Sequence, residues 1–587
     1  MAREISQERL RLDQVMISPT TSTGSTETVC FPIGPNGAKP VERIEKLVAV
    51  GFFIILLVLR WFYATNQPWD SDEPQHLHVV WGWANGMLPY KDIFDNHAPL
   101  LQAISAPVFA LFGESPDIVT KMRWAIMPFS VLVLVMTYLI GLQLFSRRIA
   151  IWGAVLAAAF PDLYSKLGEY RPDVFWCAAW LVLLWILVSG ELTARRLFWA
   201  GFVLGVSFAA SMKTSFLLLT LLLGAATVWL LRTAKPELRA QQGSSAWFLI
   251  APVLGMLIVP LTLVAFFSWK GSLAQMYYCV ITHNLAAGGD RWALLLRRIP
   301  DVRFWLFLPA IAAGIWLMKR DKDQQRGLRR FFFMSVTGLY CPLLFSIWPL
   351  ISKQDFVPFF PILILVLTCP LVSIGESIGA KTLLPAFLIP AAVAAAELTW
   401  MMSTRSPFKA ANQTNFAIIS DTLKLTHPGE TVLDAKGQAI FRPRPFYYVF
   451  EQITREMVER GQLRDDAAER LAANRTPVVV ASDWLSSSTG QFVSQNYVPV
   501  GSVLVLGKKL FPGKDGHVEF EVVIPAKYAI IGANGLLSGN LDGTELNGSR
   551  DLSPGTHELD LALPAEPVFA VWSRAIEKGF SPFSHTR

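Results

Sequence analysis

The sequence predicts a polytopic α-helical membrane protein that ends in a soluble domain of mixed helix and strand. Of its 587 residues, 52% are hydrophobic and only 17% are charged, whereas an average soluble domain carries about 25% charged residues. The hydrophobic residues also gather into runs of about 20, which is long enough to cross a hydrocarbon core of roughly 30 Å. After residue 401 these runs stop, and residues 402–587 are mostly polar. Long apolar runs followed by a polar region predict both parts of the fold.

Eleven segments are apolar enough to be predicted as membrane spans: 44–63, 122–145, 149–165, 172–190, 197–212, 214–231, 246–268, 303–318, 331–349, 357–376 and 382–401. Their orientation follows from charge, because cytoplasmic loops carry an excess of Lys and Arg. If residues 1–43 form a disordered cytoplasmic tail, the densest basic cluster (319–330) falls in a cytoplasmic loop. The C-terminal region then lies on the opposite, outer side.

This topology divides the chain into the tail 1–43, a transmembrane domain at 44–401 whose first outer loop is 64–121, and an outer soluble domain at 402–587. The outer domain is predicted as α+β, from helical patterns and short strand-like runs: TVLDAKG, PVVVASD, GSVLVLG, HVEFEVVI and THELDLAL. The net charge of +7 is assigned to cytoplasmic loops, so no nucleic-acid partner is expected. The five Cys show no CxxC spacing, which gives no support to a disulfide framework or a zinc site.

The densest group of polar residues lies at 69–100, in the first outer loop; it contains Asp70, Asp72, Glu73, His76, His78, Asp92, Asp95 and His97. Pro74 suits the first turn of a helix and Gly86 its end. The apolar spacing between them predicts a short amphipathic helix at 74–85 that lies on the membrane surface. Carboxylates beside a helix N-terminus, which also attracts phosphate, suit chemistry on a lipid phosphate. A solvated loop with ordinary helix caps is the alternative.

Four motifs then meet on the outer face of the predicted topology: Asp72-Glu73 followed by Gly86-Met-Leu-Pro89-Tyr90-Lys-Asp92 and His97-Ala-Pro99-Leu100; Arg171-Pro172-Asp173; Lys213 in SMKTS; and Lys353-Gln354 before a Pro-containing span. Together they resemble the GT-C glycosyltransferases, in the branch of the protein O-mannosyltransferases and the lipid A aminoarabinose or galacturonic acid transferases. The resemblance covers about 44–401. One departure is Ala98-Pro99 after His97, where the aminoarabinose transferases usually have Lys-Pro-Pro, so sugar and acceptor stay open.

The resemblance implies a GT-C fold and an inverting hexosyl- or pentosyltransferase. Its donor would be a polyprenyl-phosphate sugar, and its acceptor a hydroxyl of lipid A or lipopolysaccharide, of a cell-envelope glycan or of a protein. The expected place is the periplasmic face of a bacterial inner membrane, with the C-terminal domain also periplasmic.

The resemblance also implies roles for single residues. Asp72 is the expected base, Glu73 its support, and Asp173 a second acidic residue that positions the acceptor. The expected contacts to phosphate and substrate are Arg171, Lys213, Arg291, Arg297, Lys353, Gln354, Tyr90 and His97. A divalent cation, Mg or Mn, would be held by Asp72, Glu73 and Asp173.

Several alternatives stay open. Asp173 with Arg171 could form a structural ion pair, Lys213 could be a snorkelling lysine, Arg297 could anchor the chain at the interface, and His97 could hydrogen-bond its loop. A transporter or flippase of a lipid-linked sugar would place charges near the membrane midplane and often show inverted repeats. The charges here cluster in outer loops instead. A metallohydrolase would need a close His ligand set such as HExxH, and a scaffold would leave the acidic loop unexplained, so the transferase is favoured.

Overall fold

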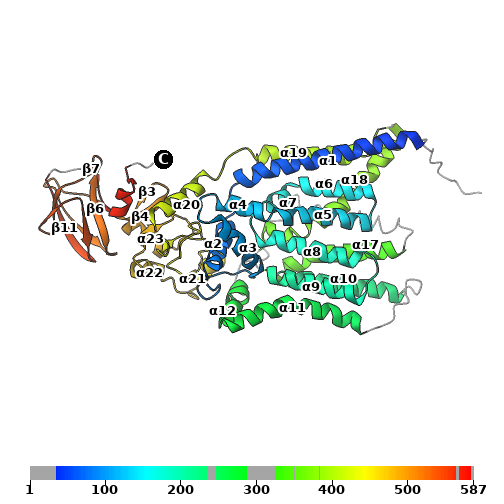
Figure 1. Ribbon diagram of the computed structural model, residues 1–587, viewed down its shortest axis with the longest axis horizontal. Coiled ribbons are helices and arrows are strands. Elements are labelled where there is room, and N and C mark those ends of the chain that lie inside the picture. The colour runs from blue at the N-terminus through cyan, green and yellow to red at the C-terminus, as the bar shows by residue number, and fades with distance from the viewer. Residues whose placement is uncertain are drawn as a thin grey trace, which may run out of the picture. The chain divides into compact units, whose positions relative to one another are not determined.

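The protein, seen in a computed structural model, is described over residues 35–234, 246–286, 324–348, 351–382, 384–562 and 567–583. In the described residues up to Thr404 the main elements are helices, and a strand-rich domain follows (Figure 1). Within the described ranges, six helical segments are long and apolar enough to cross a membrane: Val41–Asn66, Ile118–Leu144, Thr214–Thr233, Trp247–Trp269, Arg326–Ile347 and Phe360–Thr382. The chain is therefore a multi-pass membrane protein, as the sequence predicts.

The helices of the membrane part are α1 (Pro35–Asn66), α2 (Asp72–Ala84), α3 (Leu100–Phe112), α4 (Ile118–Ala125), α5 (Met127–Leu144), α6 (Arg147–Ala159), α7 (Pro161–Lys166), α8 (Pro172–Val188), α9 (Ala194–Ala210), α10 (Thr214–Ala234), α11 (Trp247–Trp269), α12 (Leu273–Tyr277), α13 (His283–Leu285), α17 (Gln324–Ile347), α18 (Phe360–Thr382) and α19 (Leu388–Thr404). The described residues of this part also include a π-helix, η2 (Tyr278–Thr282), and a 3₁₀ helix, η3 (Lys353–Phe356). The start of α1, as far as Leu47, belongs to one unit of the chain, and the described residues from Val48 onward belong to a second.

The predicted spans fall on these helices, except for 303–318, which lies outside the described residues. The segment predicted as one span at 149–165 is two helices, α6 and α7, which meet at Phe160. Pro161 explains the break, because proline lacks the backbone N–H that would continue the hydrogen-bond ladder of α6, yet suits the first position of α7.

Helices α9 and α11 pack with their backbones in contact. A Cβ on Gly201 would lie 1.9 Å from the carbonyl oxygen of Pro252, and one on Gly205 would lie 2.4 Å from that of Met256. A Cβ on Gly255 would lie 2.1 Å from the carbonyl oxygen of Phe198. Small residues four apart allow this close approach, which drives helix association within a membrane.

The first outer loop differs from the sequence-based prediction. The helix expected at 74–85 is present as α2, but residues Glu73–Gly82 are buried inside the protein, so the prediction of an amphipathic helix on the membrane surface was wrong. Helix α3, which was not predicted, covers one side of α2. The turn at Gly437 covers another, since a Cβ there would lie 3.0 Å from Gln75 Cα.

The C-terminal domain holds two sheets, with strand orders β1-β2-β4-β12-β6-β10 (where β3 pairs with β4 and β7 with β6) and β5-β11-β8-β9. Its strands are β1 (Val432–Leu433), β2 (Val478–Val479), β3 (Tyr497–Val500), β4 (Val503–Leu510), β5 (His517–Val522), β6 (Ala526–Gly532), β7 (Gly535–Leu536), β8 (Gly539–Leu541), β9 (Thr544–Leu546), β10 (Ser549–Leu552), β11 (Gly555–Leu561) and β12 (Val568–Trp572). Its helices are α20 (Gln413–Leu425), α21 (Gln452–Glu459), α22 (Ala467–Ala473), α23 (Ser487–Asn496) and α24 (Ser573–Glu577).

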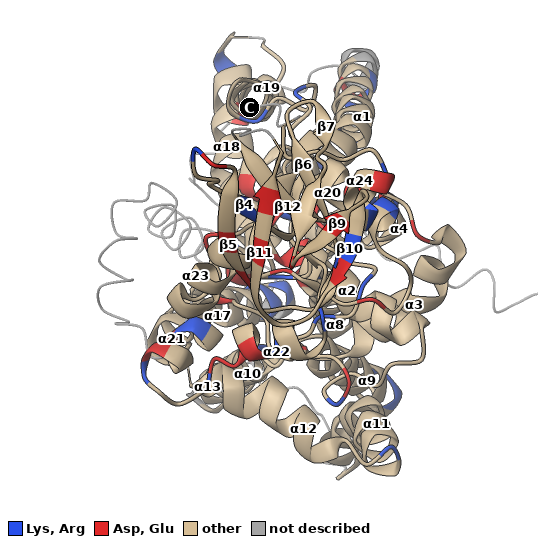
Figure 2. Cartoon of the chain, turned by 90° about the vertical axis from the view of Figure 1, so that its left-hand side faces the viewer, with Lys and Arg blue, Asp and Glu red and all other residues tan. Residues whose placement is uncertain are grey.

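Each of the five strand-like runs seen in the sequence contains a strand. In β11 the acidic residues Glu558 and Asp560 are exposed while Leu559 and Leu561 are buried, which is the two-residue alternation of a half-buried strand. Figure 2 shows the charged positions of β10 and β11 among uncharged ones. The α+β prediction for this domain is confirmed.

Polar contacts fasten the C-terminal domain to the first outer loop. The Asn412 side chain donates to the carbonyl oxygens of Thr65 and Gln67 and accepts from the Trp69 amide. Farther along, Tyr447 Oη donates to the Tyr90 carbonyl at 2.5 Å. The C-terminal domain is therefore packed against the loop that contains α2.

Candidate active site

The start of α2 holds two adjacent carboxylates that point in different directions. The turn before it is closed by local hydrogen bonds, in which Asp70 Oδ1 accepts from the Asp72 amide at 3.1 Å and Glu73 Oε2 accepts from the Asp70 amide at 2.9 Å. The Asp72 side chain is 22% exposed, whereas Glu73 is fully buried. Only Asp72 of this pair can therefore reach a bound molecule.

Arg171 lies at the centre of an ion-pair network with three aspartates. Its Nη1 donates to Asp70 Oδ1 at 2.5 Å and to Asp72 Oδ2 at 2.7 Å. Its Nε donates to Asp173 Oδ2 at 3.1 Å. Arg171 precedes Pro172, which starts α8, and Asp173 lies in the first turn, where a carboxylate is favoured. The planar guanidinium suits this role, because its donors are fixed in a fork.

Lys213 extends the network into the membrane part. It lies in the turn between α9 and α10, 3.8 Å from Asp173, and forms an ion pair with the buried Asp355. Asp355 also accepts from the Ser352 amide at 2.7 Å, in a capping box that starts η3. These contacts hold the Lys213 ammonium beside Asp173.

Lys436, from the C-terminal domain, completes the environment of Asp72. Its Nζ donates to Asp72 Oδ1 at 2.7 Å and lies 5.1 Å from the centre of the Trp484 ring. Burial alone would raise the pKa of the Asp72 carboxyl, but Arg171 and Lys436 outweigh it and hold that pKa well below its ordinary range. Asp72 is therefore an ionised carboxylate at neutral pH.

These groups surround a cavity of about 310 Å³. Asp72, Arg171, Asp173 and Lys213 line it, as do two other residues predicted from the sequence, His97 and Gln354. The C-terminal domain contributes Lys436, Trp484 and the Glu451–Ile453 segment. A carboxylate and several cations thus line one cavity, in which Asp72 can accept a proton and the cations can hold an anion.

Glu73 does not line this cavity. Arg123 Nη2 and Nε donate to it at 2.5 and 2.7 Å, and the Tyr170 amide donates at 2.7 Å. Both members of the pair are fully buried. Glu73 therefore ties α2 to α4 and to the segment before α8.

Two histidines of the loop, His76 and His97, are held by burial and by contacts within the loop. His97 Nδ1 lies 3.0 Å from Asp95 Oδ1, and its carbonyl accepts from Tyr90 Oη at 2.7 Å. Tyr90 is buried outside the cavity lining. Burial, then the neighbouring His97 and Arg171, hold the pKa of His76 well below its ordinary value, so His76 is neutral. The contacts with Asp95 and Tyr90 hold His97 in place where it lines the cavity.

The remaining predicted residues are placed elsewhere. Lys353 lies 3.8 Å from Asp162 beside a second cavity, and Arg291 and Arg297 lie outside the described residues.

In the described ranges no group of three or more His, Cys, Asp or Glu is arranged to hold a metal ion. Asp72 and Asp173 are each bound by cations, and Glu73 faces Arg123. The proposed ligand set does not fit a divalent cation in this arrangement.

Sequence reasoning missed several groups of the site. The sequence predicts no role for Asp70, although it shares Arg171 with Asp72. Ser352 and Asp355 form an S-x-x-D pattern, which indicates a capping box at a helix start and could have drawn attention to Asp355. For Lys436 and Trp484 no local pattern exists, because only folding brings them to the first outer loop.

The fold is that of GT-C glycosyltransferases. ArnT from Cupriavidus metallidurans, a lipid A aminoarabinose transferase, aligns in the apo state with a TM-score of 0.56 and 13% identity over 78% of this chain and 97% of its own. ArnT bound to undecaprenyl phosphate gives a TM-score of 0.54 at 12% identity with the same coverage. The archaeal oligosaccharyltransferase AglB from Archaeoglobus fulgidus gives 0.46 at 11% identity, over 90% of this chain and 95% of its own. No family model and no curated protein matches the sequence.

Proposed function

We propose that this protein is an inverting glycosyltransferase that moves a sugar from a polyprenyl-phosphate donor to a hydroxyl acceptor. The observation that carries the proposal is the convergence of Asp72, Arg171 and Lys213 on one cavity within a GT-C fold. ArnT of this fold is known bound to undecaprenyl phosphate, which supports a lipid phosphate as the donor's leaving group.

In the proposed reaction the acceptor oxygen attacks the anomeric carbon of the donor sugar. The new C–O bond forms as the bond between that carbon and the phosphate oxygen breaks, with inversion. Asp72 takes the acceptor proton, for which an ionised carboxylate is required. Arg171 and Lys213 stabilise the negative charge that develops on the departing lipid phosphate. Asp173 positions the acceptor, and His97 and Gln354 contact the substrate.

The proposal extends to location and domain roles. Residues 44–401 form the catalytic membrane domain, whose site faces the periplasm of a bacterial inner membrane, and residues 402–587 form a periplasmic domain. Lys436 and Trp484 support a part in the site for that domain, because they line the same cavity as Asp72. Lipid A, another envelope glycan and a protein are the candidate acceptors.

The direct test is sugar transfer from a panel of radiolabelled polyprenyl-phosphate sugars to a membrane extract by the purified full chain. We expect a labelled acceptor with wild type and at least tenfold less label with Arg171→Lys, since lysine keeps the charge but loses the fork that contacts three aspartates. Lys270→Arg, a conservative change at the end of α11 outside the cavity, serves as the control. Absence of transfer from every donor would contradict the proposal and favour a transporter or flippase.

Lys436→Met is expected to shift the pH dependence of transfer. Without the Lys436 charge, the pKa of Asp72 rises from its lowered value toward the ordinary range. Because the base must be ionised, the acid limb of the profile of kcat/KM against pH moves to higher pH. Lys424→Met, at an exposed lysine of the same domain, should leave the profile in place. An unchanged acid limb in Lys436→Met would show that Lys436 does not tune the base.

A further inference from the structure

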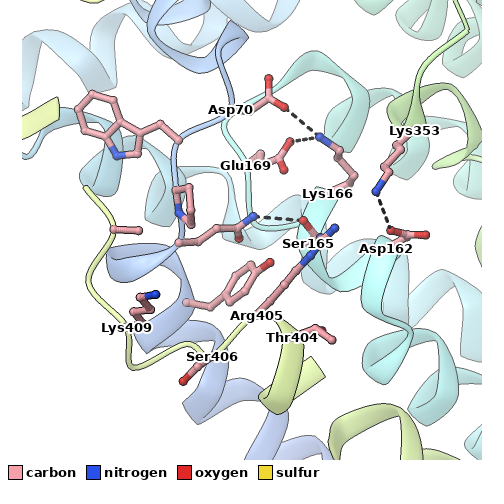
Figure 3. Close-up of a pocket in the computed structure, with 15 residues that line it drawn as sticks. Asp70, Asp162, Ser165, Lys166, Glu169, Lys353, Thr404, Arg405, Ser406 and Lys409 are labelled. Atoms are coloured by element: carbon pink, nitrogen blue, oxygen red, sulfur yellow. Dashed lines mark hydrogen bonds and ion pairs between the residues drawn. The ribbon is translucent and has the colours of Figure 1, made fainter. Parts of the chain in front are cut away.

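A second cavity, of about 480 Å³, opens beside the candidate active site (Figure 3). The ends of α1 and α7 and the segment after α19 line it. Asp70 is common to both sites, because it binds Lys166 here at 3.1 Å and Arg171 toward the first cavity at 2.5 Å. The reaction proposed above uses no side chain that lines this second cavity.

The lining has more positive charge than its own acids neutralise. Lys166 pairs with Asp70 and Glu169, and Lys353 lies beside Asp162. Burial raises the pKa of Glu169 to about 7, against the opposing charge of Lys166, so this acid is only partly ionised at neutral pH. Arg405 and Lys409 remain, and in the described part of the chain neither side chain has an ion-pair or hydrogen-bond partner. Figure 3 shows Arg405 extending into the cavity and Lys409 at its edge.

Buried donors in the same lining also lack partners within the described residues. Tyr63 is only 1% exposed, yet its hydroxyl makes no hydrogen bond, and Trp69 Nε1 is likewise buried and unpaired. Buried polar groups are normally satisfied, since an unpaired one costs free energy. Arg405 is half-buried and Lys409 is exposed, and together with the two unpaired donors they suit a negatively charged ligand rich in acceptor oxygens.

An aromatic rim, made of exposed residues, lies close in the chain to the lining residues Tyr63, Thr404 and Lys409. Trp61, Phe62, Trp400 and Phe408 are exposed, and the rings of Phe62 and Phe408 contact each other, with centres 5.2 Å apart. These aromatic residues lie at or near the ends of α1 and α19, where membrane proteins place aromatic belts. An anion with acyl chains could therefore enter from the bilayer with its chains against this rim.

We propose that this cavity binds the phosphate head group of an anionic bilayer lipid, separately from the sugar donor. Arg405 and Lys409 would contact the phosphate, and Tyr63 and Trp69 would donate hydrogen bonds to it. The inference does not depend on the transferase chemistry, and its test measures binding alone.

The test is native mass spectrometry of the purified full chain in detergent, titrated with phosphatidylglycerol. We expect one tightly bound lipid, with affinity about tenfold lower for the double variant Arg405→Gln/Lys409→Gln, because two charge-assisted contacts are lost. Lys270→Gln removes a basic residue at the end of another spanning helix and should bind like wild type. Equal thermal unfolding of the variants without lipid shows that any loss is local.

Two further ligands test whether the cavity prefers an anionic lipid over a lipid with no net charge or over free phosphate. Phosphatidylcholine, with no net charge, should bind several-fold more weakly than phosphatidylglycerol. Inorganic phosphate should bind far more weakly than either, because it lacks acyl chains for the aromatic rim. Equal binding of phosphatidylglycerol by wild type and the double variant would overturn the site. Equal affinity for the two lipids, or phosphate binding as tight as lipid binding, would overturn its assignment to an anionic lipid.

Discussion

Asp72→Asn is expected to lower kcat for sugar transfer by roughly 10²–10⁴-fold, the usual contribution of general-base catalysis. Asparagine nearly keeps the shape of the side chain but cannot accept the proton of the acceptor hydroxyl. Asp72 is the partly exposed carboxylate at the start of α2 and is held ionised by Arg171 and Lys436. Because the variant keeps Arg171 and Lys213, the proposed contacts of the donor phosphate, no large loss of donor binding is expected. Initial rates at saturating donor measure the effect.

Two controls isolate this effect. Asp117→Asn removes an exposed carboxylate that pairs with Lys121, a contact of small energetic value, and should keep wild-type activity. Thermal unfolding of Asp72→Asn checks that the loss of two ion pairs has not unfolded the protein. Full activity in Asp72→Asn would move the base elsewhere, and Asp173, which lines the same cavity, would be tested next.

Glu73→Gln is expected to destabilise the protein by about 3–5 kcal/mol, the range for breaking a buried ion pair from one side. The change leaves the Arg123 charge without its partner in a fully buried position. The expected measurement is a clearly lower midpoint of thermal unfolding in detergent. The molecules that remain folded should transfer sugar better than Asp72→Asn does, because Glu73 is a positioning residue outside the cavity lining.

A double variant makes the test sharper. Glu73→Gln combined with Arg123→Met removes both charges, and should recover part of the lost stability since no unpaired charge remains. A wild-type unfolding midpoint for Glu73→Gln alone would show that the pair contributes little. A loss of kcat as deep as that of Asp72→Asn, at unchanged stability, would instead place Glu73 in the chemistry.

Much of the architecture could be predicted because its causes are local. A run of apolar residues signals a span regardless of its neighbours, and the strand at 555–561 shows its alternation within its own residues. The same holds for the start of α2, where Asp72 and Pro74 mark a helix N-terminus before any packing is known. The predicted motifs also placed Asp72, Arg171, Asp173 and Lys213 on one face, and the structure brings these four to one cavity.

Only the tertiary structure decided which charges pair and what is buried. Glu73 and Arg123 are 50 residues apart, Lys213 and Asp355 are 142 apart, and Asp72 and Lys436 are 364 apart. No local spacing marks such pairs, because an ion pair depends on distance in space rather than along the chain. For the same reason the burial of α2, whose sequence alone has an amphipathic pattern, followed from its packing against α3 and against the Gly437 turn of the C-terminal domain.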